Sequence, residues 1–201
     1  MSKGLKIGLG ILGVVVLFII LTVSWATSKY NSFVGLNENV KSGWSQVENV
    51  YQRRADLVPN LVATVKGVAN FEKETYTAVT EARAKVGQIK LTADQLSDPA
   101  MIQKFQAAQD GLGSALSRLL VVSENYPQLK ASENFQTLQQ QLEGTENRIT
   151  VERQKYNQIA AEFNTAIKKF PGVIIANFGG FKEKEYFKAA AGSEQVPKVQ
   201  F

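Results

Sequence analysis

The sequence contains neither cysteine nor histidine. Without cysteine there is no disulfide, thiolate metal site or cysteine nucleophile. Without histidine the chain lacks the commonest general base near neutral pH, and it cannot supply the Glu-x-x-His pairs of a carboxylate-bridged di-iron bundle. The sequence also shows no glycine-rich phosphate loop, calcium loop or serine in a nucleophile setting. We therefore expect a protein that is not an enzyme and that binds no cofactor and no metal.

Most of the net positive charge of the chain lies around one hydrophobic segment, and the rest of the chain is nearly neutral. The whole chain has 23 basic and 18 acidic residues, a formal charge of +5. Lys3, Lys6 and Lys29 flank a hydrophobic segment, so residues 30–201 carry 23 − 3 = 20 basic against 18 acidic residues, or +2. A nearly neutral domain argues against a surface that follows nucleic-acid phosphates. We expect no nucleic-acid partner.

One long hydrophobic run lies near the N-terminus. Residues 7–25 contain no charge, and as a helix they would be about 28 Å long, close to the roughly 30 Å of a bilayer's hydrocarbon core. A cleaved signal peptide is the alternative, because Ser24 and Ala26 place small residues at the −3 and −1 positions of a cleavage site. The run exceeds the usual signal-peptide core of roughly 7 to 15 residues. We predict that residues 1–29 are an N-terminal tail and a transmembrane anchor in contact with the lipid bilayer.

The lysines around this run predict its orientation. Lys3, Lys6 and the N-terminal amine precede it, and Lys29 and Lys41 follow it. The positive-inside rule therefore favours, by about one charge, a cytoplasmic N-terminus and an exported domain. We expect a single-pass protein of the cell membrane.

Apolar residues after the anchor recur in alternating steps of four and three, which is typical of helices. One such stripe runs from Val40 to Val86, and Pro59 lies inside it. No glycine surrounds this proline, which favours a kinked continuous helix over a turn. Ser97 or Asp98 before Pro99 predicts the start of another helix.

A second repeat, from Phe135 to Phe170, predicts a long last helix with coiled-coil-like packing. The predicted fold is all-α: a transmembrane helix followed, over residues 30–171, by an elongated antiparallel up-and-down bundle of three to four long helices. Residues 172–201 are expected to pack on one end of this bundle. That packing would bury Phe178, Phe181, Tyr186 and Phe187.

Several short motifs follow the anchor in a fixed order. They are Tyr30-Asn31, Trp44, Arg53-Arg54-x-Asp56-Leu57-Val58-Pro59-Asn60-Leu61-Val62, Leu116-Ser117-Arg118-Leu119, Glu124-x-Tyr126-Pro127, Glu146-Asn147-x-Ile149, Tyr156-Asn157, Phe163-Asn164 and Phe170-Pro171. Together they resemble the LemA family of bacterial membrane proteins over essentially the whole chain after the anchor. The resemblance implies a membrane-tethered helical bundle without known catalytic residues, in a family sometimes linked with membrane peptidases or other membrane machinery.

A dense polar set, Arg53, Arg54, Asp56 and Asn60, lies beside the proline. One interpretation is a docking surface for an acidic partner or a lipid headgroup. The other is a capped kink whose arginines pair with carboxylates of the bundle.

Charged residues also fall on or beside the apolar stripes, where hydrophobic residues are expected: Glu72, Arg83, Arg118, Glu152 and Arg153. A buried charge without a partner costs several kcal/mol. We therefore expect buried ion pairs between helices at these positions.

These observations give two hypotheses of function. The first is a non-enzymatic scaffold or adaptor for membrane or envelope machinery, with a protein partner. The alternative is a self-associating, homo-oligomeric protein that organises the membrane.

Overall fold

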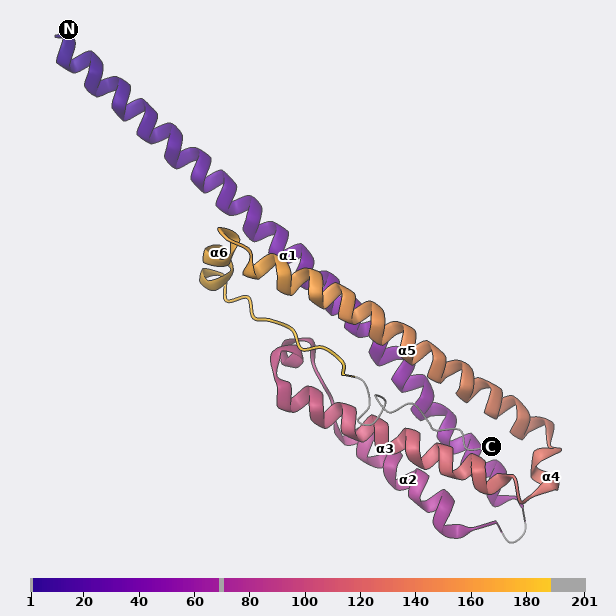
Figure 1. The fold of residues 1–201 in the computed structure, drawn as a ribbon. Helices are drawn as coiled ribbons and strands as arrows, with labels where there is room; N and C mark the ends of the chain where they lie inside the picture. The colour runs from indigo at the N-terminus through magenta and orange to yellow at the C-terminus, as the bar shows by residue number, and fades with distance from the viewer. Residues whose placement is uncertain (1, 69–70, 189–201) are drawn as a thin grey trace, which may run out of the picture.

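The computed structural model describes residues 2–68 and 71–188. Every regular element in this part of the chain is helical (Figure 1). The elements in chain order are α1 (Lys3–Lys66), α2 (Lys73–Gln88), the 3-10 turn η1 (Ala93–Ser97), α3 (Pro99–Ser123), α4 (Pro127–Lys130), α5 (Glu133–Lys168) and α6 (Gly172–Phe178). The predicted all-α class is confirmed.

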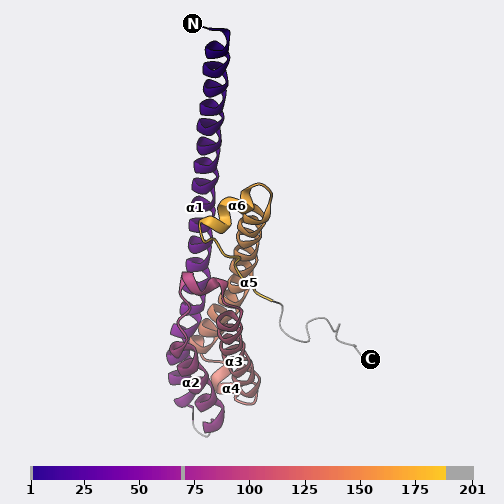
Figure 2. The same cartoon turned by 90° about the vertical axis from the view of Figure 1, so that its left-hand side faces the viewer.

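Helix α1 is 64 residues long and combines two roles. Its first part holds the one segment of the described chain that is long and apolar enough to cross a membrane, and none of that segment is buried against the protein. Figures 1 and 2 show this part standing clear of the other helices. Phe33 is the first buried residue of the same helix, and from Val40 onward a side chain is buried at least every three or four residues. The candidate span and the bundle core are therefore joined without a break.

Pro59 lies inside α1, so the prediction of a continuous helix is confirmed. Proline has no N–H, which leaves the carbonyl of the residue four positions earlier, Ala55, without its helical donor. Arg83 of α2 supplies one: its Nε donates to the Ala55 carbonyl oxygen at 2.8 Å. The helix continues because the neighbouring helix satisfies the orphaned carbonyl.

The stripe over residues 40–86 is not a single helix. Helix α1 ends at Lys66 and α2 begins at Lys73. Leu61 and Val65 of α1, Phe71 between the two helices and Val79 of α2 are buried in the same hydrophobic cluster. The apolar spacing continues from α1 into α2 because both helices face one core. The periodicity alone therefore did not reveal where the first helix ends and the second begins.

The helices alternate in direction (Figures 1 and 2). Helix α5 runs back along α1, and α2 and α3 pack as a second pair beside them. Two clusters fill the space between the pairs. The one nearer the candidate span includes Trp44, Phe105, Tyr156, Phe163 and Phe187, and the distal one includes Leu61, Leu112, Leu119, Leu129 and Phe135.

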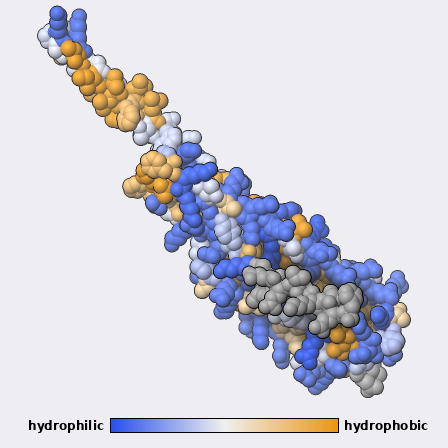
Figure 3. Space-filling model, in the orientation of Figure 1, coloured by the Kyte–Doolittle hydropathy of each residue, from blue (hydrophilic) through white to orange (hydrophobic). Residues whose placement is uncertain are grey.

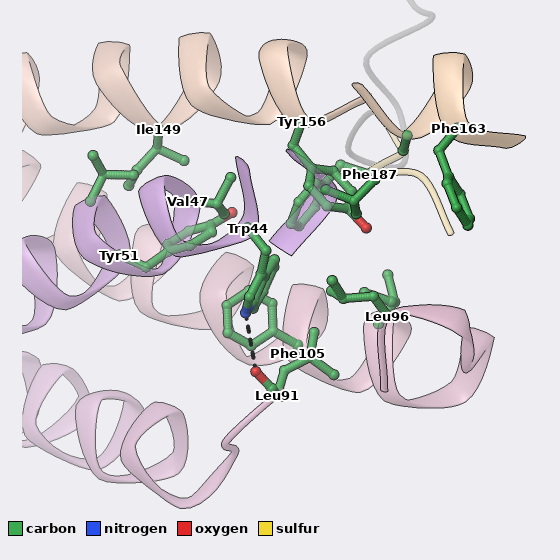
Figure 4. Close-up of a cluster of buried hydrophobic side chains, with 14 of the residues drawn as sticks. Trp44, Val47, Tyr51, Leu91, Leu96, Phe105, Ile149, Tyr156, Phe163 and Phe187 are labelled. Atoms are coloured by element: carbon green, nitrogen blue, oxygen red, sulfur yellow. Dashed lines mark hydrogen bonds between the residues drawn. The ribbon is translucent and has the colours of Figure 1, made fainter. Parts of the chain in front are cut away.

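The chain after α6 is extended along α5 as far as residue 188. Phe187 is buried and stacks on Trp44, with ring centroids 6.0 Å apart. Figure 4 shows this ring between Trp44 and Tyr156. The predicted burial of Phe178 and Tyr186 is wrong, because both are exposed. Residues 189–201, the rest of the predicted packing segment, lie outside the described residues.

Candidate functional site: a buried arginine beside an open groove

The predicted polar set beside Pro59 is divided between two faces of α1. Arg53, Asp56 and Asn60 are exposed, whereas Arg54 is 3% exposed. Helical geometry explains the split, because positions 53, 56 and 60 share one face and position 54 is turned by about 100° toward the core. The set therefore does not form one surface.

Arg54 connects α1 to the two helices opposite it. Its Nη1 donates to Glu146 Oε2 of α5 at 2.9 Å. Its Nη2 donates to Gln109 of α3 twice, to the backbone carbonyl at 2.8 Å and to the side-chain Oε1 at 2.7 Å. A guanidinium suits this position because its donors are fixed in one plane and point to several acceptors at once.

Tyr51 of α1 and Gly113 of α3 lie beside the guanidinium of Arg54. Its carbon lies 5.2 Å from the centre of the Tyr51 ring, within range of a cation–π contact. A Cβ at Gly113 would lie 3.5 Å from Nη1, in ordinary van der Waals contact with it. Burial raises the pKa of the Tyr51 phenol, while the positive charges of Arg153 and Arg54 oppose that rise. Arg54 Nε is buried without a hydrogen-bond partner among the described residues.

A groove of about 650 Å³ opens beside Arg54, between α3 and α5. Its lining is mixed: apolar side chains from both helices, small residues of α3, and the carboxylates Asp110, Glu143 and Glu146. Glu146 is 58% exposed, so the ion pair with Arg54 has one buried and one solvated end. The groove can form apolar contacts, hydrogen bonds and ion pairs. Apart from Arg54 and Glu146, which pair with each other, its charged side chains are the carboxylates Asp110 and Glu143.

Glu72, Arg118 and Glu152 do not occupy the buried inter-helix pairs that were predicted for them. Glu72 is exposed just before α2 and accepts a hydrogen bond from the Thr75 hydroxyl. It lies outside the helical stripe because α1 ends at Lys66 and α2 begins only at Lys73. Arg118 is exposed. Glu152 is largely buried but pairs with Lys155 of its own helix at 2.8 Å.

Arg83 and Arg153 make contacts between elements, but with backbone carbonyls in place of carboxylates. Arg83 donates to Ala55, as described above. Arg153 Nη2 donates to the Lys188 carbonyl at 2.7 Å, and its guanidinium carbon lies 5.0 Å from the centre of the Phe187 ring. Within residues 2–68 and 71–188, the ion pair that joins two helices is Arg54 with Glu146, and the sequence did not indicate Glu146 as the partner.

The sequence patterns did not reveal what Asn157 and Asn164 do. Each side-chain amide both donates to and accepts from the backbone of one residue in the extended segment: Asn157 with Phe187 at 2.9 Å in both directions, and Asn164 with Lys184 at 2.8 Å in both directions. Both lie in motifs that carried the family resemblance. The sequence held one signal of this role, which was their spacing. Seven positions are two helical turns, so both side chains lie on one face of the helix.

Among the described residues, no group of three or more acidic side chains is placed so that it could hold a metal ion. Burial also raises the pKa of Tyr156, whose hydroxyl donates to the Glu185 carbonyl at 3.2 Å. This phenol is thus a neutral structural donor.

Comparison with known proteins agrees with the architecture. A sequence model of the LemA family matches residues 43–201. Magnetosome protein MamQ of Magnetospirillum gryphiswaldense is 30% identical over 192 residues, covering 88% of this chain and 71% of that protein. Magnetosome protein MamQ 2 of Paramagnetospirillum magneticum is 30% identical over 189 residues, covering 86% and 70%. Protein LemA of Metamycoplasma hominis is 26% identical over 159 residues, covering 77% and 68%.

Proposed function

We propose that this chain, which belongs to the LemA family, is a single-pass membrane protein that acts as a non-enzymatic scaffold or adaptor for membrane or envelope machinery. The observation that carries the proposal is the continuity of α1, which holds both the candidate span and Arg54. Trp25 and Arg54 are 29 positions apart on one helix, or about 43 Å. The groove is therefore held at a fixed height above the bilayer.

The groove indicates the chemistry of the partner. Leu116, Leu120 and Leu142 provide apolar surface, while Asp110 and Glu143 place negative charge at its rim. An amphipathic segment with apolar and basic side chains fits both features. We propose that such a segment of an extramembrane domain binds here, and a membrane peptidase is one partner class that the family resemblance implies.

The relatives are named for different settings. Two are named as magnetosome proteins and a third simply as LemA. A helical framework of the LemA family that serves in more than one setting agrees with a scaffold or adaptor role.

Site-specific crosslinking in native membranes tests the proposal. A photoreactive residue at Ser117, which lines the groove, should give a reproducible adduct with one protein. The same residue at Gln52, exposed on α1, and an anchor-only chain of residues 1–29 are the controls. The double charge reversal Asp110→Lys, Glu143→Lys should abolish the adduct, because it removes the negative rim.

The size and identity of the adduct distinguish the two hypotheses. An adduct of twice the chain's mass that contains only this protein would replace the adaptor proposal with the self-associating alternative. Absence of any adduct specific to Ser117 would contradict a docking role for the groove.

A further inference from the structure

Two aromatic side chains on the folded domain are unusually exposed. Phe178 at the end of α6 is 89% exposed and Phe170 in the turn before α6 is 81% exposed. Both exceed every large hydrophobic side chain of the candidate span, the most exposed of which is Phe18 at 69%. Ile174, one turn from Phe178 on the same helix face, is exposed as well. Such a cluster on a soluble surface usually marks an interaction site.

The position of α6 is fixed against the upper part of α1. A Cβ at Gly172 would lie 3.1 Å from the Phe33 ring, so glycine permits this close approach. Phe181, just after α6, packs on Tyr30 and Phe33 with ring centroids 5.5 and 5.7 Å away. Trp25, the last residue of the apolar run, and Phe170 line the same groove. The exposed cluster is thus beside the end of the candidate span.

Figure 3 shows the same relation on the molecular surface. Hydrophobic colour covers the span and reappears on the domain at α6, the part of the fold nearest to the span, with hydrophilic surface over most of the visible face beyond it. Tyr30 is five positions after Trp25, about 7.5 Å along the helix. The headgroup layer on each side of a bilayer is about 5 to 8 Å thick. Helix α6 and the residues just after it contact α1 from Tyr30 to Phe33, about 7.5 to 12 Å beyond Trp25. Helix α6 therefore lies at the outer edge of the headgroup layer when residues 7–25 span the bilayer.

Positive charge predominates around the cluster, although the carboxylate Glu162 also lines the groove shared by Trp25 and Phe170. Lys29 and Lys169 line the groove shared by Trp25 and Phe170, and Lys168 and Lys182 are exposed nearby. Lys168 is paired with Glu183 at 2.6 Å. Lys29, Lys169 and Lys182 make no ion pair with any residue that the structure describes. Free lysines beside exposed aromatic residues are typical of surfaces that lie on anionic lipid headgroups.

We propose that α6 and the turn before it are a second membrane contact, with Phe170, Ile174 and Phe178 inserted in the headgroup layer and Lys29 and Lys169 on anionic headgroups. The inference rests on the proposed membrane-spanning anchor. Contact at two points fixes the rotation of the bundle about α1, so the Arg54 groove faces a constant direction relative to the membrane.

The absence of cysteine makes a direct test available. Single cysteines in the full-length chain at Leu12, Phe178 and Val121 are labelled with an environment-sensitive fluorophore, and the protein is reconstituted in phosphatidylcholine vesicles containing phosphatidylglycerol and lipids with a quencher in the upper acyl chain. Quenching at Leu12 shows whether residues 7–25 lie in the bilayer. Val121 is the matched control, since it is an exposed hydrophobic residue at the far end of α3.

We expect strong quenching at Leu12, several-fold stronger quenching at Phe178 than at Val121, and a reduction at Phe178 when Lys29→Ala and Lys169→Ala are combined. Quenching at Leu12 together with equal, weak quenching at Phe178 and Val121 would overturn the second contact while the anchor stands. Weak quenching at all three sites would overturn the anchor and this inference together. Circular dichroism of each labelled chain verifies that it is folded.

Discussion

At the scale of single residues, Arg53 and Arg54 show how strongly position on a helix decides the role of a charge. Arg53 is in water, whereas Arg54 is buried with three hydrogen bonds to α3 and α5. Taking Arg54 away leaves the buried side-chain Oε1 of Gln109 without its donor, and a buried unsatisfied polar group costs about 1 to 3 kcal/mol.

We therefore predict that Arg54→Met lowers the free energy of unfolding by about 1 to 3 kcal/mol. Glu146→Gln should cost less than about 1 kcal/mol, because the amide still offers an oxygen to Nη1 and the position is partly solvated. Arg53→Met is the control and should change stability by no more than about 0.5 kcal/mol. Urea unfolding in mild detergent, followed by circular dichroism, measures all three. Equal values for Arg54→Met and Arg53→Met would contradict this account.

Arg83 and Pro59 should be energetically coupled. Arg83→Met leaves the Ala55 carbonyl, which lies on a buried residue, without a donor and should cost about 1 to 3 kcal/mol. In a Pro59→Ala background, the new N–H at position 59 can donate to that carbonyl, so the same change should cost about 1 kcal/mol less.

A double-mutant cycle in the same unfolding assay measures this coupling. Arg118→Met, at an exposed arginine of α3, is the matched control and should show no coupling to Pro59. Strict additivity of Arg83→Met and Pro59→Ala would mean that Arg83 does not compensate for the proline.

At the scale of elements, the extended segment is held on α5 by matched spacing. Asn157 and Asn164 are seven helical positions apart, about 10.5 Å. Their partners Phe187 and Lys184 are three extended positions apart, about 10 Å. The two amides therefore meet two backbone positions in register, and the Glu185 N–H also donates to the Leu96 carbonyl at 2.8 Å.

We predict that Asn157→Asp together with Asn164→Asp loosens this segment. A carboxylate can accept from the backbone N–H but cannot donate to the carbonyl, and each lost hydrogen bond is worth about 1 kcal/mol, or roughly fivefold faster exchange. Hydrogen exchange at Lys184 and Phe187 measures the effect. Asn147→Asp, exposed on the same helix, should leave both amides protected. Unchanged exchange in the double variant would show that burial of Phe187 alone holds the segment.

At the scale of the whole molecule, a single helix of about 96 Å links the candidate span to the bundle. Orientation in the membrane then decides which compartment contains the groove. Lys3, Lys6 and the N-terminal amine precede the span, and we predict a cytoplasmic N-terminus with an exported bundle.

Cysteine labelling of intact cells with a membrane-impermeant maleimide tests this topology. Val121→Cys should react from outside, and Ser2→Cys should react only after the cells are opened. The native chain contributes no background because it has no cysteine. Labelling of Ser2→Cys alone in intact cells would reverse the topology and place the groove in the cytoplasm.

The sequence alone determined the features that depend on local composition. The apolar run of residues 7–25, the helical class, the Asp98–Pro99 start of α3 and the continuity of α1 through Pro59 were all predictable. Each follows from periodicity, capping chemistry or hydrophobicity, which act over a few neighbouring residues. The absence of cysteine and histidine likewise limited the available chemistry without reference to the fold.

Only the tertiary structure decided which polar groups meet. The pairing of Arg54 with Gln109 and Glu146 joins residues 55 and 92 positions apart, and the donor for the Ala55 carbonyl comes from the next helix. The end of α1 at Lys66 and the start of α2 at Lys73 were concealed because both helices bury their apolar faces in one core. The exposure of Phe178 was equally a tertiary outcome: hydrophobicity indicates that a side chain leaves water, but the packing of α6 against α1 decides whether protein or, as we propose, lipid covers it.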